Sequence, residues 1–297
     1  MSENAAPLLD NPHLDKSGAD LDRQRFRMLE DIARELSGQL VFPTCFDPVL
    51  KLRKALDDPY MALDQIAALV ALEPLVSARI LAMANAAMYN PGGEEVRDLR
   101  RAIARLGINL VRTTALAIAM RQLMQMRSVV AFQEQSDRLW QHSLRTASAA
   151  YVLARAFTRI NPDEAMLAGM VHDVGAFYMI YRASQYEELV LRPDTTKHLV
   201  MRWHESVGHA LAVALGIPET VASAIVDHDQ PRPLPEPPRT LADVVYLGNL
   251  LAGGKFEWLD MPPEAAAADL EKLQALHAQF KDDIDAHEAA TRAALGS

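Results

Sequence analysis

Apolar residues recur at helical spacing through most of this chain of 297 residues, and this periodicity most narrows what the chain can fold into. In the stretch 21–40, for example, Leu29, Ile32 and Leu36 fall on one side of a helix. Alternating β-branched and aromatic runs closed by tight Gly-containing turns, which mark β-hairpins, are nearly absent. The sequence therefore predicts an all-α fold.

Breaks in the periodicity divide the predicted helices into two packed bundles and a final helix. Residues 1–20 carry acids and prolines without helical spacing, so we expect a disordered lead. The N-terminal bundle should span 21–127, and a second bundle 137–254, because the stretch between them has weak periodicity and Gly253-Gly254 follows the last apolar helix.

Residues 263–295 predict a C-terminal amphipathic helix with a narrow apolar seam. The seam consists of Leu270, Leu273, His277, Phe280, Ile284, His287 and Thr291. It fits a helix folded back as a cap on the second bundle and a dimerising coiled coil about equally, since two seam positions are histidines and one is threonine. A homo-oligomer through this helix is therefore one of two open alternatives.

Composition excludes several classes of protein. A content of 50% hydrophobic and 23% charged residues is that of a packed globular chain. No stretch is long and apolar enough to predict a membrane span, and the first residues do not resemble a secretory signal. The single cysteine, Cys45, cannot form an internal disulfide and receives no role. We expect a cytoplasmic protein.

Nucleic-acid binding is disfavoured by the formal net charge of −9. The local exception is a run of five arginines, which are Arg97, Arg100, Arg101, Arg105 and Arg112. Charged residues at such spacing usually form the solvated side of an amphipathic helix, and we favour that interpretation here.

The residues that could carry chemistry gather in the second bundle. They are His142, the pair His172-Asp173, His204, His209 and the pair His228-Asp229. Imidazole nitrogens and carboxylate oxygens are the usual ligands of divalent metals, and side chains from several helices converge readily inside a bundle. A metal held there could activate water for phosphoester hydrolysis. A single histidine in an apolar helix, in contrast, is more often a hydrogen-bonded core residue.

The sequence around these residues resembles a known family. The segment from Leu167 to Gly175, LAGMVHDVG, is similar to the LAGLLHDIG motif of the HD superfamily. The segment from Ala67 to Tyr89 is similar to the DPALTARLLRLANSAYY stretch of its HDOD branch. Further similarities lie at Leu99–Gly107, around His204 and around His228, so the resemblance covers roughly 42–252. It implies a second bundle of HD type.

Three positions depart from the catalytic members of that superfamily. Those enzymes have a polar residue after the motif glycine and a metal-binding aspartate in the last helix, where this chain has Ala176 and Asn249. The second histidine of the family's terminal His-His pair is Asp229 here. An amide is a weaker metal ligand than a carboxylate, so the resemblance implies a vestigial or ligand-binding pocket. Its residues would be His142, His172, Asp173, His204, His228 and Asn249.

The resemblance implies a bacterial signal-transduction protein without catalysis, which acts through a protein partner or a signalling nucleotide. We expect no cofactor, or a divalent metal at low occupancy on His142, His172, Asp173 and His228. The alternative is a metal-dependent phosphohydrolase that acts on a nucleotide or a cyclic dinucleotide. His204 and His228 leave that alternative open, because extra histidines build a second metal position in some HD relatives.

Overall fold

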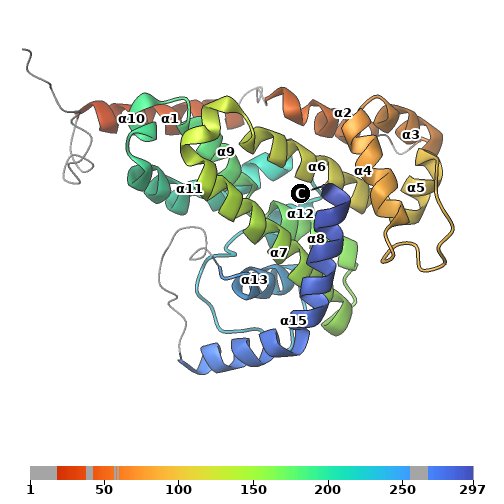
Figure 1. The fold of residues 1–297 in the computed structure, drawn as a ribbon. Coiled ribbons are helices and arrows are strands. Elements are labelled where there is room, and N and C mark those ends of the chain that lie inside the picture. Colours follow the sequence, from red (N-terminus) through yellow and green to blue (C-terminus); the bar gives the residue numbers. More distant parts are fainter. Residues whose placement is uncertain (1–18, 38–42, 57, 59, 255–266, 297) are drawn as a thin grey trace, which may run out of the picture.

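The fold is built from helices joined by turns and loops (Figure 1). This computed structural model describes residues 19–37, 43–56, 58, 60–254 and 267–296. The described residues contain no strand, so the all-α prediction is confirmed. Most of the expected disordered lead, 1–20, lies outside the described residues, as do 263–266 at the start of the expected C-terminal helix.

The N-terminal bundle consists of five helices that pack on one another. They are α2 (Asp47–Leu56), α3 (Leu63–Ala71), α4 (Pro74–Asn85), α5 (Leu99–Leu106) and α6 (Ile108–Met124). A short 3-10 turn, η2 (Thr44–Phe46), precedes them. Asp98 caps α5 by accepting a hydrogen bond from the backbone of Arg101. Gly107 has a φ of 77° between α5 and α6, which lets the chain bend there by 106°.

The first helix, α1 (Ala19–Ser37), differs from its expected place at the start of the N-terminal bundle. Its main contacts are with α10 (Glu187–Val190) and α11 (Pro193–Ala214), and Figure 1 shows it lying alongside them. Glu35 accepts hydrogen bonds from Tyr178 and Arg182, and Asp31 accepts one from Tyr186. Amphipathic spacing shows that one side of a helix is buried, but it does not show which other helices cover that side. The sequence therefore could not place α1.

The second bundle is built around a long central helix, α7 (Gln133–Phe157), which follows the short 3-10 helix η3 (Arg127–Phe132). Helices α8 (Pro162–Val171), α9 (Val174–Ala183) and α13 (Leu241–Leu251) pack against it, while α11 packs against α9, and α12 (Glu219–Ala224) packs against α8 and α13. Helix α7 begins at Gln133, four residues before the expected boundary at 137. Helices α6, α8 and α9 are in contact, so the two bundles share one apolar core.

Two helices of the second bundle approach each other through glycines. A Cβ added to Gly175 on α9 would lie 2.0 Å from the carbonyl oxygen of His204 and 2.5 Å from the nitrogen of Gly208, both on α11. Only glycine fits between two backbones at this distance. The approach brings the start of α9, and with it Asp173, against His204.

The last helix, α15 (Ala267–Leu295), folds back along α7 and reaches α4 (Figure 1). Of the predicted seam, Phe280, Ile284, His287 and Thr291 are buried, whereas Leu270 is 41% exposed. Arg145 on α7 pairs with Asp285 and Glu288 of α15. These contacts are those of a capping helix, and self-association through it stays a prediction.

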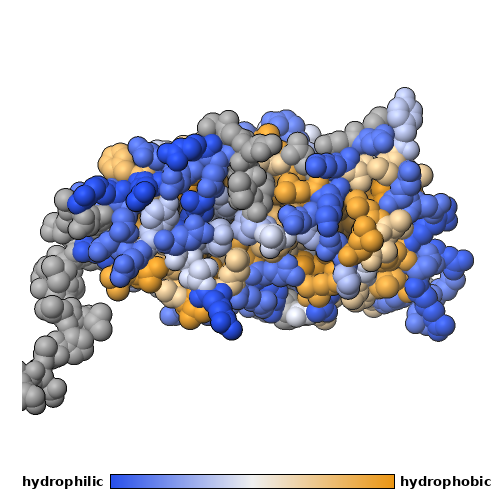
Figure 2. Space-filling view, turned by 90° about the horizontal axis from the view of Figure 1, so that it is seen from above, coloured by the Kyte–Doolittle hydropathy of each residue, from blue (hydrophilic) through white to orange (hydrophobic). Residues whose placement is uncertain are grey.

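None of the described helices is by itself long and apolar enough to cross a membrane, and α5 and α6 meet that criterion only as a sharply bent pair. Viewed from above, hydrophilic residues cover much of the surface, and hydrophobic residues gather over the half occupied by the N-terminal bundle (Figure 2).

Candidate metal centre

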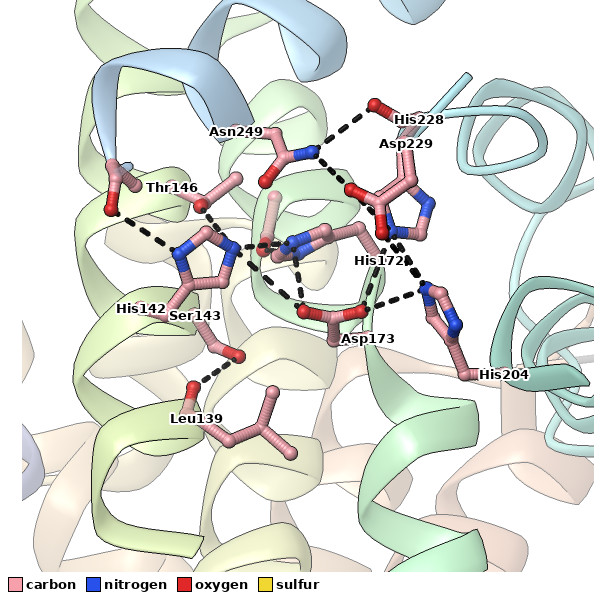
Figure 3. Close-up of polar contacts among 12 residues, drawn as sticks. Leu139, His142, Ser143, Thr146, His172, Asp173, His204, His228, Asp229 and Asn249 are labelled. Atoms are coloured by element: carbon pink, nitrogen blue, oxygen red, sulfur yellow. Dashed lines mark hydrogen bonds and ion pairs between the residues drawn. The ribbon is translucent and has the colours of Figure 1, made fainter. Parts of the chain in front are cut away.

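Four histidines and two aspartates converge in the core of the second bundle (Figure 3). His142 comes from α7, and His172 and Asp173 lie between α8 and α9. His204 lies on α11, and His228 and Asp229 follow α12. None of the four histidines nor Asp173 is more than 2% exposed. The structure thus brings together the pocket residues expected from the sequence, His142, His172, Asp173, His204 and His228, and adds Asp229. His209 is half-buried and belongs to neither of the two ligand groups found among the described residues.

All four imidazole rings are oriented by backbone carbonyl groups. The Nδ1 atom of His172 lies 2.8 Å from the carbonyl oxygen of Gly169, and that of His204 lies 2.9 Å from the carbonyl of Val200. The Nδ1 atoms of His142 and His228 make the corresponding contacts at 3.3 and 2.8 Å with Ala252 and Ile225. A carbonyl accepts only from an N–H, so each Nδ1 carries a proton and each Nε2 of a neutral ring offers a lone pair.

The four Nε2 atoms face one another and the carboxylate of Asp173 (Figure 3). In the first group, His142 Nε2 lies 3.1 Å from His172 Nε2, and these atoms lie 3.7 and 3.2 Å from Asp173 Oδ2. In the second group, His204 Nε2 and His228 Nε2 are 3.4 Å apart and lie 3.5 and 3.3 Å from Asp173 Oδ1. Asp173 therefore belongs to both groups, one oxygen to each.

Both groups fit a divalent metal ion. Ligands that each lie about 2.1 Å from a tetrahedral metal are roughly 3.4 Å from one another, which is close to the separations in both triangles. Asp173 Oδ1 and Asp229 Oδ2 are buried and make no hydrogen bond. Nitrogen and oxygen atoms that converge in this way are the arrangement that a bound cation satisfies.

Asp229 adds a second carboxylate beside the second group. Its Oδ2 lies 3.4 Å from His204 Nε2, and its backbone N–H donates to Glu205. The turn that presents it has Asp227 in the left-handed region, with a φ of 59°, a conformation that costs a non-glycine residue about 1 kcal/mol or more. The sequence comparison treated Asp229 only as the loss of a histidine. Asp229 directly follows His228, and this position was the available signal that its carboxylate takes the place of the family's second histidine.

Asn249 occupies the edge of the cluster and is buried. Its Nδ2 donates to the carbonyl oxygen of His228 and to Asp229 Oδ1, both at 3.0 Å, while its Oδ1 is buried without a donor. Asn249 therefore positions Asp229 through a hydrogen bond. A carboxylate at this position could not donate that bond and would repel Asp229.

The protonation of the cluster is set by burial and by the two carboxylates. Burial would raise the pKa of Asp173, but interactions with His172 and His228 hold it well below its ordinary value. Burial would lower the pKa of His228, but its interaction with Asp173 raises that pKa to about 9. Burial dominates at His172, whose pKa is lowered. The first group thus keeps a neutral ring at His172, while the second binds a proton that a metal would displace.

The family can be assigned at this point. Residues 42–231, more than half of the chain, match the model of the HDOD domain. The chain belongs to the HDOD family. The histidine-aspartate cluster agrees with this assignment, because its residues come from the segments whose sequences resemble the family.

Solved structures share the fold of this HDOD protein. One, from Shewanella amazonensis SB2B, belongs to a protein proposed to be a metal-dependent phosphohydrolase; it is 20% identical, aligns over 92% of this chain and 99% of its own, and has a TM-score of 0.67. An HDOD domain protein of unknown function from Geobacter sulfurreducens is 21% identical over 92% and 99% of the two chains, with a TM-score of 0.57. At these identities the similarity shows the fold alone.

A curated relative, an uncharacterized protein of Treponema pallidum, is 22% identical over 219 residues. The alignment covers 68% of the HDOD chain but only 40% of that relative. The chain therefore spans less than half the length of this relative.

The structure also shows the surroundings of two features noted in the sequence outside the cluster, Cys45 and the run of arginines. Burial raises the pKa of the Cys45 thiol to about 11, which keeps it protonated and unreactive. Of the arginine run, Arg97, Arg100 and Arg101 pair with the carboxylates of Glu95, Asp64 and Asp98, respectively. Arg105 donates to backbone carbonyl groups.

Proposed function

We propose that this HDOD protein is a non-catalytic signalling module whose second bundle is organised by a buried metal centre. It acts by binding a protein partner or a signalling nucleotide, not by turning over a substrate. Structures of relatives with the same fold include a proposed signal transduction protein from Marinobacter aquaeolei VT8, with a TM-score of 0.56, 19% identity, and coverage of 97% of this chain and 66% of that one.

The main support for the proposal is that protein encloses the potential metal ligands on all sides. Metal-dependent hydrolysis needs a coordination position that water and substrate can reach. The four histidines, Asp173 and Asn249 are each at most 2% exposed, and the packed helices α7, α8, α11 and α13 surround them. A metal bound there would be closed off by protein, as in structural sites, and would hold together the segments that carry its ligands.

The second ligand group is the better candidate for occupancy. It offers two imidazoles and Asp173, with the Asp229 carboxylate beside them, whereas Asp173 is the only carboxylate of the first group. The greater negative charge near the second group favours a divalent cation. Manganese, iron and zinc all accept such a mixed nitrogen and oxygen set.

A phosphohydrolase is the second candidate, and one observation favours it. Asp173 contributes one oxygen to each ligand group, so it could bridge two metals, and paired metals can stabilise both the attacking and the leaving oxygen of a phosphoester. In that case a metal-bound water would supply the nucleophile. This alternative requires the enclosing helices to open.

Hydrolysis assays separate the two candidates. The purified protein is incubated with manganese, magnesium or iron, and with bis(p-nitrophenyl) phosphate or a cyclic dinucleotide as substrate. We expect no metal-dependent turnover. Turnover that disappears in both His172→Ala and His228→Ala but persists in His209→Ala, with all three variants folded, would establish the enzyme instead.

A further inference from the structure

The turn that carries His228 and Asp229 is the part of the cluster that lies closest to solvent. Residues 225–230 follow α12 as an irregular turn, in which Asp227 and Gln230 are exposed. Asp229 is itself partly exposed, whereas the other cluster residues are each at most 2% exposed. The exposure of this turn marks it as the place where an ion can reach the second ligand group.

The same turn is the least firmly built of the segments that carry ligands. His142 and His204 lie inside long helices, and Asp173 lies at the close approach of α9 and α11. Within the turn, in contrast, the backbone of Asp227 is in the left-handed region, which strains a residue other than glycine. Exposed segments of this kind open locally before the rest of a fold does. The contacts that hold the turn closed therefore decide how readily an ion passes.

Glu205 on α11 holds the turn closed from outside the cluster. Its Oε1 accepts a hydrogen bond from the backbone N–H of Asp229 at 2.9 Å, and its Oε2 accepts one from Nε2 of Gln230 at 3.2 Å. The same Oε1 lies 3.8 Å from Nδ1 of His228, where its charge favours the tautomer that leaves Nε2 free for a metal. The Glu205 side chain is 17% exposed and belongs to neither ligand group.

We propose that Glu205 is a positioning residue that controls how fast the second ligand group exchanges a divalent metal. While its hydrogen bonds hold, the turn keeps Asp229 and the Nε2 atom of His228 on the ion. When these bonds break, the turn opens and withdraws both ligands, so only His204 and Asp173 are left to hold the ion. This inference rests on the proposed metal centre and adds a route and a rate of exchange to it.

The test follows the release of zinc from the loaded protein to an excess of the chromophoric chelator pyridylazoresorcinol. A release rate that stops rising with chelator concentration reports an opening of the protein itself. We expect Glu205→Ala to release zinc about tenfold faster or more. Glu205→Gln keeps an oxygen that can accept from the Asp229 backbone, so it should release zinc at nearly the parent's rate. Glu219→Ala removes an equal charge from an exposed position on α12 and should leave the rate unchanged.

Two further measurements separate this role from a general loss of stability. In the metal-free protein, Glu205→Ala should speed hydrogen exchange of the Asp229 amide, which loses its acceptor, while the amides of α7 keep their protection. Asp227→Val strains the turn at an exposed position and changes neither Glu205 nor a ligand, because a β-branched residue fits a positive φ poorly. This variant should also release zinc faster than the parent.

The outcomes distinguish a wrong inference from a wrong metal centre. If the parent protein holds no zinc, the metal centre is wrong and this inference falls with it. If the parent holds zinc but Glu205→Ala or Asp227→Val releases it no faster than Glu219→Ala does, the metal centre stands and the role of Glu205 is refuted.

Discussion

The Nε2 atoms of His142 and His172 lie 3.1 Å apart, although both rings already use Nδ1 toward a backbone carbonyl. Burial lowers the pKa of His172, so its Nε2 presents a lone pair to His142. Two acceptors at this distance need a cation between them or a proton on one of them. This contact motivates the first prediction.

The His172→Ala variant should lose about 1–3 kcal/mol of unfolding free energy, because it leaves Asp173 buried with fewer partners. It should also lose the stabilisation that a metal on the first ligand group provides. A metal at a hundredfold excess over its dissociation constant adds about 2.7 kcal/mol to the wild type. Denaturant unfolding with manganese and with a chelator measures both effects. A variant that melts like the parent under both conditions would contradict a metal on the first ligand group.

Asp173 and Asp229 should differ in their effect on metal content. Asp173 serves both ligand groups, so Asp173→Asn should abolish binding at both, while Asp229→Asn should weaken only the second group, by about tenfold or more. Elemental analysis of metal per chain measures the difference, with the exposed Asp282→Asn as control. Full metal content in Asp173→Asn would exclude a shared carboxylate.

Gly175→Ala should be among the most damaging single-methyl additions in the chain. Its Cβ would overlap the backbone of α11 at 2.0 Å, and backbone cannot move aside as a side chain does. We expect a loss of about 3 kcal/mol or more, or no folded protein. Gly92→Ala is the matched control, because nothing lies within 4 Å of the added atom. Equal thermal melts of the two variants would refute the close approach of α9 and α11.

Acid should loosen the contact between α15 and α7 through His287. Burial lowers the pKa of His287 to about 4 from an ordinary 6.5, so between these values the unfolded chain binds the extra proton. Stability therefore falls as the pH drops from 6.5 to 4, by about 3 kcal/mol from this residue. His287→Gln should flatten that slope, whereas the exposed His198→Gln should not. The measurement is the free energy of unfolding between pH 4 and 6.5. If the wild type and His287→Gln show the same dependence on pH, His287 titrates normally and the prediction is wrong.

A chain that ends at Gly254 should be less stable than the full chain. Removal of α15 withdraws Phe280 and Ile284 from the apolar cluster with α7 and α13, and each buried side chain contributes about 1.5–3 kcal/mol. Thermal melting measures the loss, and sedimentation reports whether α15 also mediates self-association. An unchanged melting temperature together with unchanged sedimentation would mean that the helix has neither role.

Local sequence was sufficient to predict much of the fold and the members of the cluster. Helical spacing is a property of neighbouring residues, so the all-α class could be read directly. The pair His172-Asp173 stood in a distinctive motif, and His142, His204 and His228 lay in segments expected to join it. The structure places all of them within one contact network.

Features that depend on contacts between distant segments could not be predicted. The partners of α1 are set by Glu35 meeting Tyr178 and Arg182, residues far away in the sequence. The contribution of Asp229 depends on the left-handed turn at Asp227 and on the amide of Asn249, which together aim its carboxylate.

The four carbonyl groups that orient the histidines carry one more consequence. Since His142, His172, His204 and His228 are all aimed by main-chain atoms, no neighbouring side chain has to be kept for the rings to hold their direction. Substitutions around the cluster are then tolerated as long as the helix backbones keep their positions. Relatives only a fifth identical could keep the same ring geometry, and this core should change its ligands one at a time before it changes its shape.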